Sequence, residues 1–139
     1  MKKRVLVVDP GEKRIGIAIS DPTGTIANPL KVIIHVSRVV NAARIAQIAS
    51  EVEAECIVVG QVLDDDGGIG PAARKALRLA EAIRAQTDLP VELWDESGST
   101  NEAREARFRM GVKRQKRSGH LDELAAVIIL QSYLDAHSH

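Results

Sequence analysis

Two short apolar runs separated by a polar turn open the chain. Val5–Val8 are apolar throughout, Asp9 follows them, and a second run rich in β-branched residues extends from Arg14 to Ser20. This pattern predicts a buried strand over Arg4–Asp9, a tight Pro-Gly connection and an antiparallel second strand. A carboxylate at the end of a core strand is costly unless something uses it. Asp9 therefore either starts the turn, as Asp commonly does, or serves a metal ion or a reacting phosphate.

The apolar pattern of the remaining chain alternates between helical and strand periods. The expected elements are a strand over Ile26–Ile34, a helix capped by Ser37 and running to Ala54, a strand over Cys56–Gly60, a helix over Pro71–Thr87, a strand over Val91–Trp94, a helix from Ser99 to Met110, and a last helix from Gly119 to Ala136. A three-stranded meander followed by alternating helices and strands predicts an α/β fold, a mixed five-stranded sheet flanked by helices. No repeat or linker interrupts residues 1–139, so one domain is expected.

Helical spacing also suggests which side chains of two helices face the core. In the first helix the expected apolar positions are Val39, Val40, Ala43, Ala46 and Ile48. In the last helix the expected buried stripe is Leu121, Leu124, Ala125, Ile128 and Ile129.

Composition is that of a globular protein without membrane or disulfide features. The chain has 139 residues, 45% hydrophobic and 27% charged, with a formal net charge of zero and a single cysteine, Cys56. One cysteine excludes an intramolecular disulfide and a Cys-based zinc pattern, which fits a reducing, cytoplasmic location. The apolar start is too short for a signal peptide, and no stretch approaches a membrane span, so no membrane partner is expected.

Positive charge is concentrated in one segment, residues 104–117. Its one acid is Glu105, and its basic residues are Arg104, Arg107, Arg109, Lys113, Arg114, Lys116 and Arg117. Such a segment in a neutral chain is a candidate phosphate-binding surface, and a solvated surface balanced by acids elsewhere is the competing interpretation. Lys13 and Arg14 lie close to Asp9, and since side chains alternate along a strand only one of them faces the site; Arg14 is favoured.

Acidic residues stand where strands end or a helix begins. Asp9 ends the first strand, Asp95 and Glu96 end the fifth, and Asp122 falls in the first turn of the last helix. Ligand chemistry gathers at the carboxyl ends of such strands, and oxygen-only clusters favour Mg²⁺ or Mn²⁺. Two such ions can activate water and stabilise the leaving oxygen of a phosphodiester. Alternatively, Asp122 only complements the helix dipole and Glu96 is a solvated strand end. Asp95 and Glu96 point to opposite faces, so one of them enters a site.

Several motifs together resemble the YqgF family, also called RuvX. The resemblance spans nearly the whole chain and is carried by Asp9–Gly16, Val58–Gly60, Asp95-Glu96, Leu121–Ala126 and Ile129–Leu134. It implies a ribonuclease H-like fold and a nuclease similar to Holliday junction resolvases, linked to maturation of the small-subunit ribosomal RNA precursor at the 5′ end of pre-16S rRNA.

By the same resemblance, Asp9, Glu96 and Asp122 match the metal-binding acidic positions of the family, with Asp95 beside them. The implied function is a metal-dependent endonuclease acting on pre-rRNA or branched DNA with Mg²⁺ or Mn²⁺. Nucleic-acid contacts would then come from Lys13, Arg14, Arg107, Lys113, Arg114, Lys116 and Arg117, through salt-sensitive phosphate contacts.

The chain departs from the family pattern beside the acids. Ser97 and Gly98 stand where the family usually has Arg and an apolar residue, and Gln61-Val62 replace Leu-Pro. Losing the Arg removes a charge near the expected site, and Gly98 loosens the turn. These departures keep open the alternative that the protein is a non-catalytic nucleic-acid-binding or ribosome-associated protein that retains the fold.

A second alternative is an actin-like phosphotransferase, but such an enzyme would need a second copy of the fold. A monomer and a homodimer are both open; a dimer would suit two symmetric cuts in a junction.

Overall fold

A computed structural model of the chain describes residues 3–61, 70–95 and 120–137. Its elements, in chain order, are β1 (Val5–Pro10), β2 (Arg14–Ser20), β3 (Ala27–Ile34), α1 (Arg38–Glu51), β4 (Cys56–Gln61), α2 (Pro71–Arg84), β5 (Val91–Asp95) and α4 (His120–His137). The helix expected from Ser99 to Met110 lies outside the described residues. None of the described helices combines the length and apolar character required to cross a bilayer.

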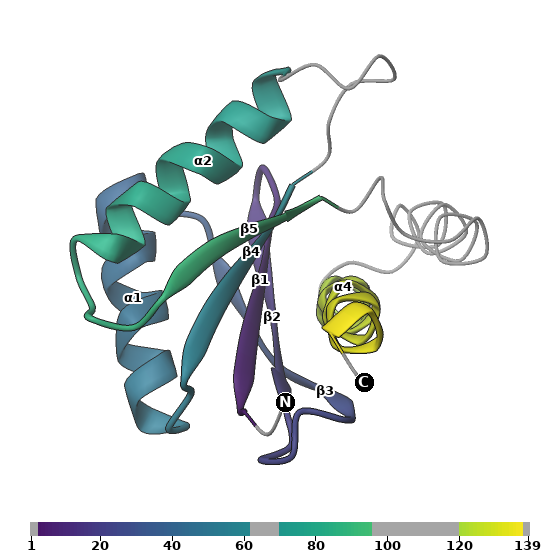
Figure 1. The fold of residues 1–139 in the computed structure, drawn as a ribbon. Helices are drawn as coiled ribbons and strands as arrows, with labels where there is room; N and C mark the ends of the chain where they lie inside the picture. The colour runs from purple at the N-terminus through teal and green to yellow at the C-terminus, as the bar shows by residue number, and fades with distance from the viewer. Residues whose placement is uncertain (1–2, 62–69, 96–119, 138–139) are drawn as a thin grey trace.

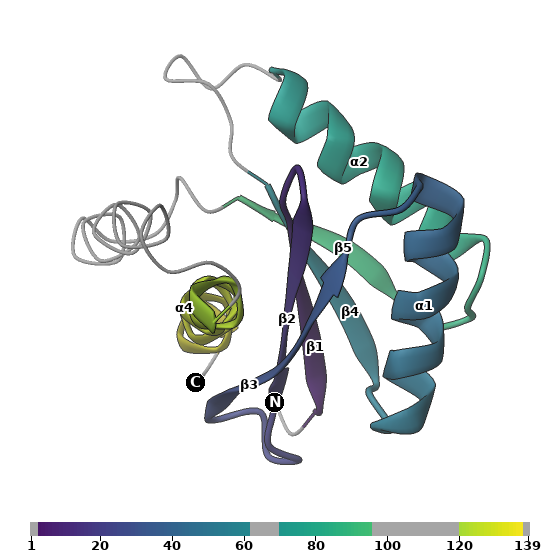
Figure 2. The same ribbon diagram turned by 180° about the vertical axis from the view of Figure 1, so that it is seen from behind.

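The strands form one five-stranded sheet in the order β3-β2-β1-β4-β5. The first three strands pair antiparallel as a meander, and β1, β4 and β5 pair in parallel. The mixed five-stranded sheet expected from the sequence is therefore confirmed. Since β1, β4 and β5 run in the same direction, their carboxyl ends share one edge of the sheet. Helices α1 and α2 cover one face of this sheet, and α4 covers the other (Figures 1 and 2).

Each face of the sheet has its own apolar cluster, because successive side chains of a strand point to opposite faces. In β1, Leu6 and Val8 pack with the residues of α1 and α2. Val5 and Val7 pack instead with α4. All four side chains are fully buried, which explains why the first strand is an unbroken apolar run.

Helix α1 begins where expected but buries a different face. Ser37 is its N-cap, with its hydroxyl accepting a hydrogen bond from the Val40 amide at 3.2 Å. The expectation for Val39, Val40 and Ala43 is wrong, because Val39 and Val40 are 66% and 41% exposed and Ala43 is exposed as well. The buried stripe is Asn41, Ala42, Ile45, Ile48 and Ala49. The alanines of this stripe let the helix backbone approach the sheet closely, which valine at the same positions would prevent.

Helix α4 also differs from the expected stripe. Ala125 and Ile129 are buried as expected, whereas Leu124 and Ile128 are partly exposed. The side chain of Leu121 lies outside the described residues. The buried residues are Ala125, Ala126, Ile129, Leu130, Tyr133 and Leu134. The helix is apolar around most of its circumference, so periodicity alone does not select one face.

Candidate active site

Asp9 lies near the carboxyl end of β1 and is 9% exposed. It pairs across the sheet with Gly16 of β2. The neighbouring pair on the same face, Val7 and Ala18, packs in the apolar cluster under α4. Asp9 therefore points to the α4 face, and its direct cross-strand neighbour has no side chain to cover the carboxylate.

The connection between β1 and β2 is built around Gly11. Its amide donates to the carbonyl oxygen of Arg14 at 3.0 Å. A Cβ atom at Gly11 would lie 2.4 Å from that same carbonyl oxygen, so only glycine fits without moving the backbone. A second backbone hydrogen bond joins this connection to the residue after β3: the His35 N–H donates to the Lys13 carbonyl oxygen at 2.9 Å. These two hydrogen bonds hold the backbone of the connection between Asp9 and Arg14.

We expect Gly11→Ala to destabilise the protein by about 1–3 kcal/mol, the range for forcing extra atoms into a packed site. The strain falls on the backbone carbonyl of Arg14, which no side-chain rotation relieves. Urea unfolding of both proteins measures the difference. Gly24→Ala in the β2–β3 turn is the comparison variant, and its loss of stability would have a different cause. Gly24 has φ 70°, a backbone conformation that is strained for alanine. A Gly11→Ala protein as stable as wild type would contradict the close approach.

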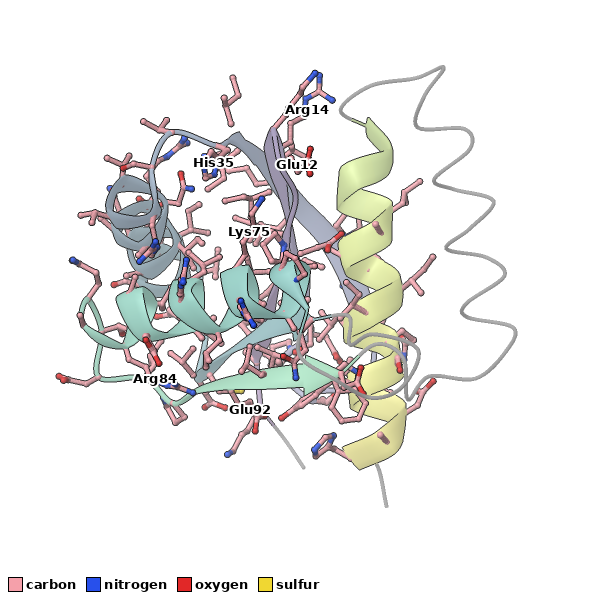
Figure 3. The ribbon with its side chains drawn as sticks, turned by 90° about the horizontal axis from the view of Figure 1, so that it is seen from above. Glu12, Arg14, His35, Lys75, Arg84 and Glu92 are labelled. Atoms are coloured by element: carbon pink, nitrogen blue, oxygen red, sulfur yellow. The ribbon has the colours of Figure 1, made fainter. Side chains whose placement is uncertain are left out.

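The structure separates the two basic residues that follow Asp9. Arg14 is the first residue of β2 and has the same strand parity as Gly16, so it shares the face of Asp9. Lys13 lies in the connection and is exposed. Figure 3 shows Arg14 at the hairpin end of the sheet, on the side where α4 begins. The sequence favoured Arg14 over Lys13 at this face, and the strand alternation agrees.

Asp95 shares the sheet edge with Asp9 but has the opposite strand parity. It is the last residue of β5 and pairs with Gln61, the last residue of β4. Because β4 lies between β1 and β5, the two backbones are two strand spacings apart, roughly 10 Å. Val91 and Leu93, which alternate in step with Asp95, pack toward α1 and α2. By strand alternation, Asp95 therefore belongs to the face of the sheet opposite to that of Asp9.

The other expected ligands are only partly described. The backbone of Asp122 lies in the first turn of α4, the helix that covers the face of Asp9. The side chain of Asp122, and Glu96 as a whole, lie outside the described residues, as do Arg107, Lys113, Arg114, Lys116 and Arg117. Within the described part of the chain, no three His, Cys, Asp or Glu side chains are grouped closely enough to hold a metal ion.

An aromatic cluster packs the C-terminal half of α4 against β5. Tyr133 stacks on His137 with ring centroids 4.0 Å apart, and Trp94 meets Tyr133 edge-on at 5.4 Å. The Tyr133 hydroxyl donates a hydrogen bond to Glu92 Oε1. Burial and this carboxylate raise the pKa of Tyr133, so the phenol stays protonated. Trp94 also packs against the apolar cluster under α4. The partnership of Tyr133 with Glu92 has no sequence signal beyond the helical position of Tyr133.

This arrangement of sheet and helices is a ribonuclease H-like α/β fold, as comparison with solved structures shows. Among solved structures, Thermus thermophilus RuvC in complex with a Holliday junction substrate is similar, with a TM-score of 0.59 and 18% identity over 98% of this chain and 97% of that chain. Thermus thermophilus RuvC alone gives a TM-score of 0.58 at 15% identity, covering 96% and 95%. At these identities the likeness shows the fold.

The chain belongs to the RuvX family. The family model, described as Holliday junction resolvase, matches residues 3–136. A relative from Thermoanaerobacter pseudethanolicus, named "Putative pre-16S rRNA nuclease", is 40% identical over 134 residues, covering 96% of both chains. Relatives of the same name from Syntrophus aciditrophicus and Listeria monocytogenes are 43% and 40% identical, covering 96% and 95% of this chain and 89% and 97% of theirs. The family expected from the sequence motifs is confirmed.

Proposed function

We propose that this protein is an endonuclease that hydrolyses phosphodiester bonds and acts at the 5′ end of pre-16S rRNA. The observation that carries the proposal is the placement of Asp9: a nearly buried carboxylate at the carboxyl end of β1, on the α4 face, with Arg14 on the same side. The names of relatives about 40% identical over nearly the whole chain support the substrate. Branched DNA is the second substrate to test, because of the description of the family model.

The carboxylate set fits a hard divalent cation, Mg²⁺ or Mn²⁺, since both ions prefer oxygen ligands. Asp9, Glu96 and Asp122 are the proposed ligands. Glu96 is preferred to Asp95 because the parity of β5 gives Asp95 the opposite face. When bound, the ions would supply an activated water and stabilisation of the leaving oxygen.

The remaining functional residues act on the substrate backbone. Arg14 lies on the face of Asp9, where a guanidinium can hold a phosphate through two parallel hydrogen bonds. We propose that Lys13 and the basic residues of segment 104–117 add salt-sensitive phosphate contacts that position the strand without reading its sequence. We propose that residues 1–139 form one nuclease domain that works in the cytoplasm.

Metal removal gives the direct test of this function. The full-length protein is incubated with a labelled pre-16S rRNA 5′ segment or a four-way DNA junction, in Mg²⁺, Mn²⁺ or chelator. We expect cutting with at least one metal and a rate at least ~100-fold lower in chelator, since loss of even an outer partner of a metal site costs up to this much. The better-cut substrate identifies the target. Binding without cutting in any metal would contradict the nuclease and leave the non-catalytic binding protein.

A further inference from the structure

A cavity of about 700 Å³ opens at the same sheet edge as Asp9 but on the opposite face. It lies between the β1–β2 hairpin, the start of α1 and the first turns of α2. Its floor contains the buried side chains of Ile15 and Leu79, both members of the apolar cluster under α1 and α2. The volume is within the roughly 300–1,000 Å³ of small-molecule sites, and an apolar floor suits a planar ring.

The rim of this cavity is positively charged. Arg38 of α1 and Lys75 and Arg78 of α2 line it, with one carboxylate, Glu12. Three cations against one anion leave two net positive charges at the rim, His35 not counted. Lys75 and Arg78 are three positions apart on α2 and are therefore neighbours on one face of the helix. Figure 3 shows Lys75 near Glu12 and His35, which come from two other segments.

His35 contributes a hydrogen-bond donor of fixed orientation to this rim. Its Nδ1 lies 2.8 Å from Nδ2 of Asn41, a polar side chain only 1% exposed. The Asn41 Oδ1 already accepts the Val36 amide at 3.1 Å, so Nδ2 is the donor to the ring. Nδ1 of His35 then accepts, which places the ring hydrogen on Nε2. The ring that lines the cavity is thus held in the tautomer that donates from Nε2.

Two helices also begin at this cavity. Arg38 is the first residue of α1 and Pro71 the first of α2, and both line the cavity. Each helix has 14 residues. Helix N-termini favour anions because their first amide groups have no partner within the helix. In α2 the amides that follow Pro71 have no side-chain cap, whereas in α1 the Val40 amide is already bound by Ser37. Cations, a fixed donor and two helix starts around an apolar floor are together suited to a phosphate attached to a planar base.

We propose that this cavity binds the phosphate monoester of a nucleotide, with the base against the apolar part of its lining and the phosphate at Arg38, Lys75 and Arg78. Pro10 and Gly11 line the cavity directly after Asp9, so only the hairpin separates it from the candidate active site. If the proposed nuclease function holds, the ligand is the phosphorylated end of a substrate strand that passes over the hairpin. A free mononucleotide has the same chemistry and is the other source.

Binding is measured by calorimetry on the full-length protein in chelator, so that it does not depend on cleavage. The probes are adenosine 5′-monophosphate against adenosine, and a short RNA with a 5′-phosphate against the same RNA with a 5′-hydroxyl. We expect the monophosphate to bind at least tenfold more tightly than adenosine. We expect K75Q/R78Q to lose at least about tenfold in affinity, since two charged hydrogen-bond donors are removed.

Arg74→Gln is the matched control, because Arg74 is an exposed cation of α2 that does not line the cavity. Its affinity should stay within twofold of wild type, and circular dichroism of each variant confirms folding. A preference for the 5′-phosphate RNA identifies a strand end, whereas a preference limited to the mononucleotide identifies a free nucleotide. Equal binding of monophosphate and adenosine, or equal losses in K75Q/R78Q and Arg74→Gln, would overturn the proposal. Cleavage of the substrates without binding of the monophosphate would contradict the nucleotide-binding role of the cavity and leave the proposed nuclease function standing.

Discussion

Replacing Asp9 by asparagine is expected to lower the rate of phosphodiester cleavage by at least ~100-fold while leaving the fold intact. Asparagine has nearly the shape of aspartate, so the side chain still fits beside Gly16 at the end of β1. It lacks the negative charge that a divalent cation requires, and removing one proposed metal ligand should cost at least as much as removing an outer partner of a metal site. The measurement is cleavage of the pre-16S rRNA segment and of the DNA junction by both proteins.

Asp88→Asn is the control for this experiment. Asp88 is exposed in the connection between α2 and β5, at the opposite edge of the sheet from Asp9. The same chemical change there should leave the cleavage rate within about twofold of wild type, as for a surface substitution. If Asp9→Asn cuts as fast as Asp88→Asn under the same metal conditions, Asp9 has no catalytic role and serves only the turn that follows β1.

The largest effect on stability is expected from Leu130→Ala in α4. Leu130 is fully buried in the apolar cluster between α4 and the sheet. Truncating it leaves a cavity, which costs about 2–5 kcal/mol of the free energy of unfolding. Urea denaturation followed by circular dichroism gives this free energy. Because α4 carries Asp122, we also expect partial loss of cleavage at temperatures where the variant begins to unfold.

Ile128→Ala is the matched comparison, on the same helix and two residues away. Ile128 is partly exposed, so its truncation should cost only about 1 kcal/mol. Leu and Ile differ in helix propensity by only about a few tenths of a kcal/mol, so propensity does not explain a difference of about 1 kcal/mol or more between the two variants. The two variants also distinguish the buried face of α4 seen in the structure from the one expected from the sequence, which contained Ile128 and omitted Leu130. A larger loss for Ile128→Ala would mean that α4 packs in that other orientation.

The sequence by itself determined the order of the elements and the type of sheet. The apolar run before Asp9 and the Pro10-Gly11 turn define a hairpin, and the later short strands separated by helical segments leave few topologies. The ends of β2 and β3 fell within one residue of expectation. These features are local: strand alternation, turn chemistry and the Ser37 cap act over a few residues, so neighbouring positions suffice to show them.

Only the tertiary structure decided which faces are buried and which side chains meet. In α1 and α4 several apolar faces were available, and the fit of small residues such as Ala42 and Ala126 against the sheet selected one of them. The parity that groups Asp9 with Arg14 depends on strand pairing across the hairpin. The charged cavity joins Arg38 with Lys75, residues from helices separated by β4. Such contacts depend on packing between distant segments, which no local pattern of the chain specifies.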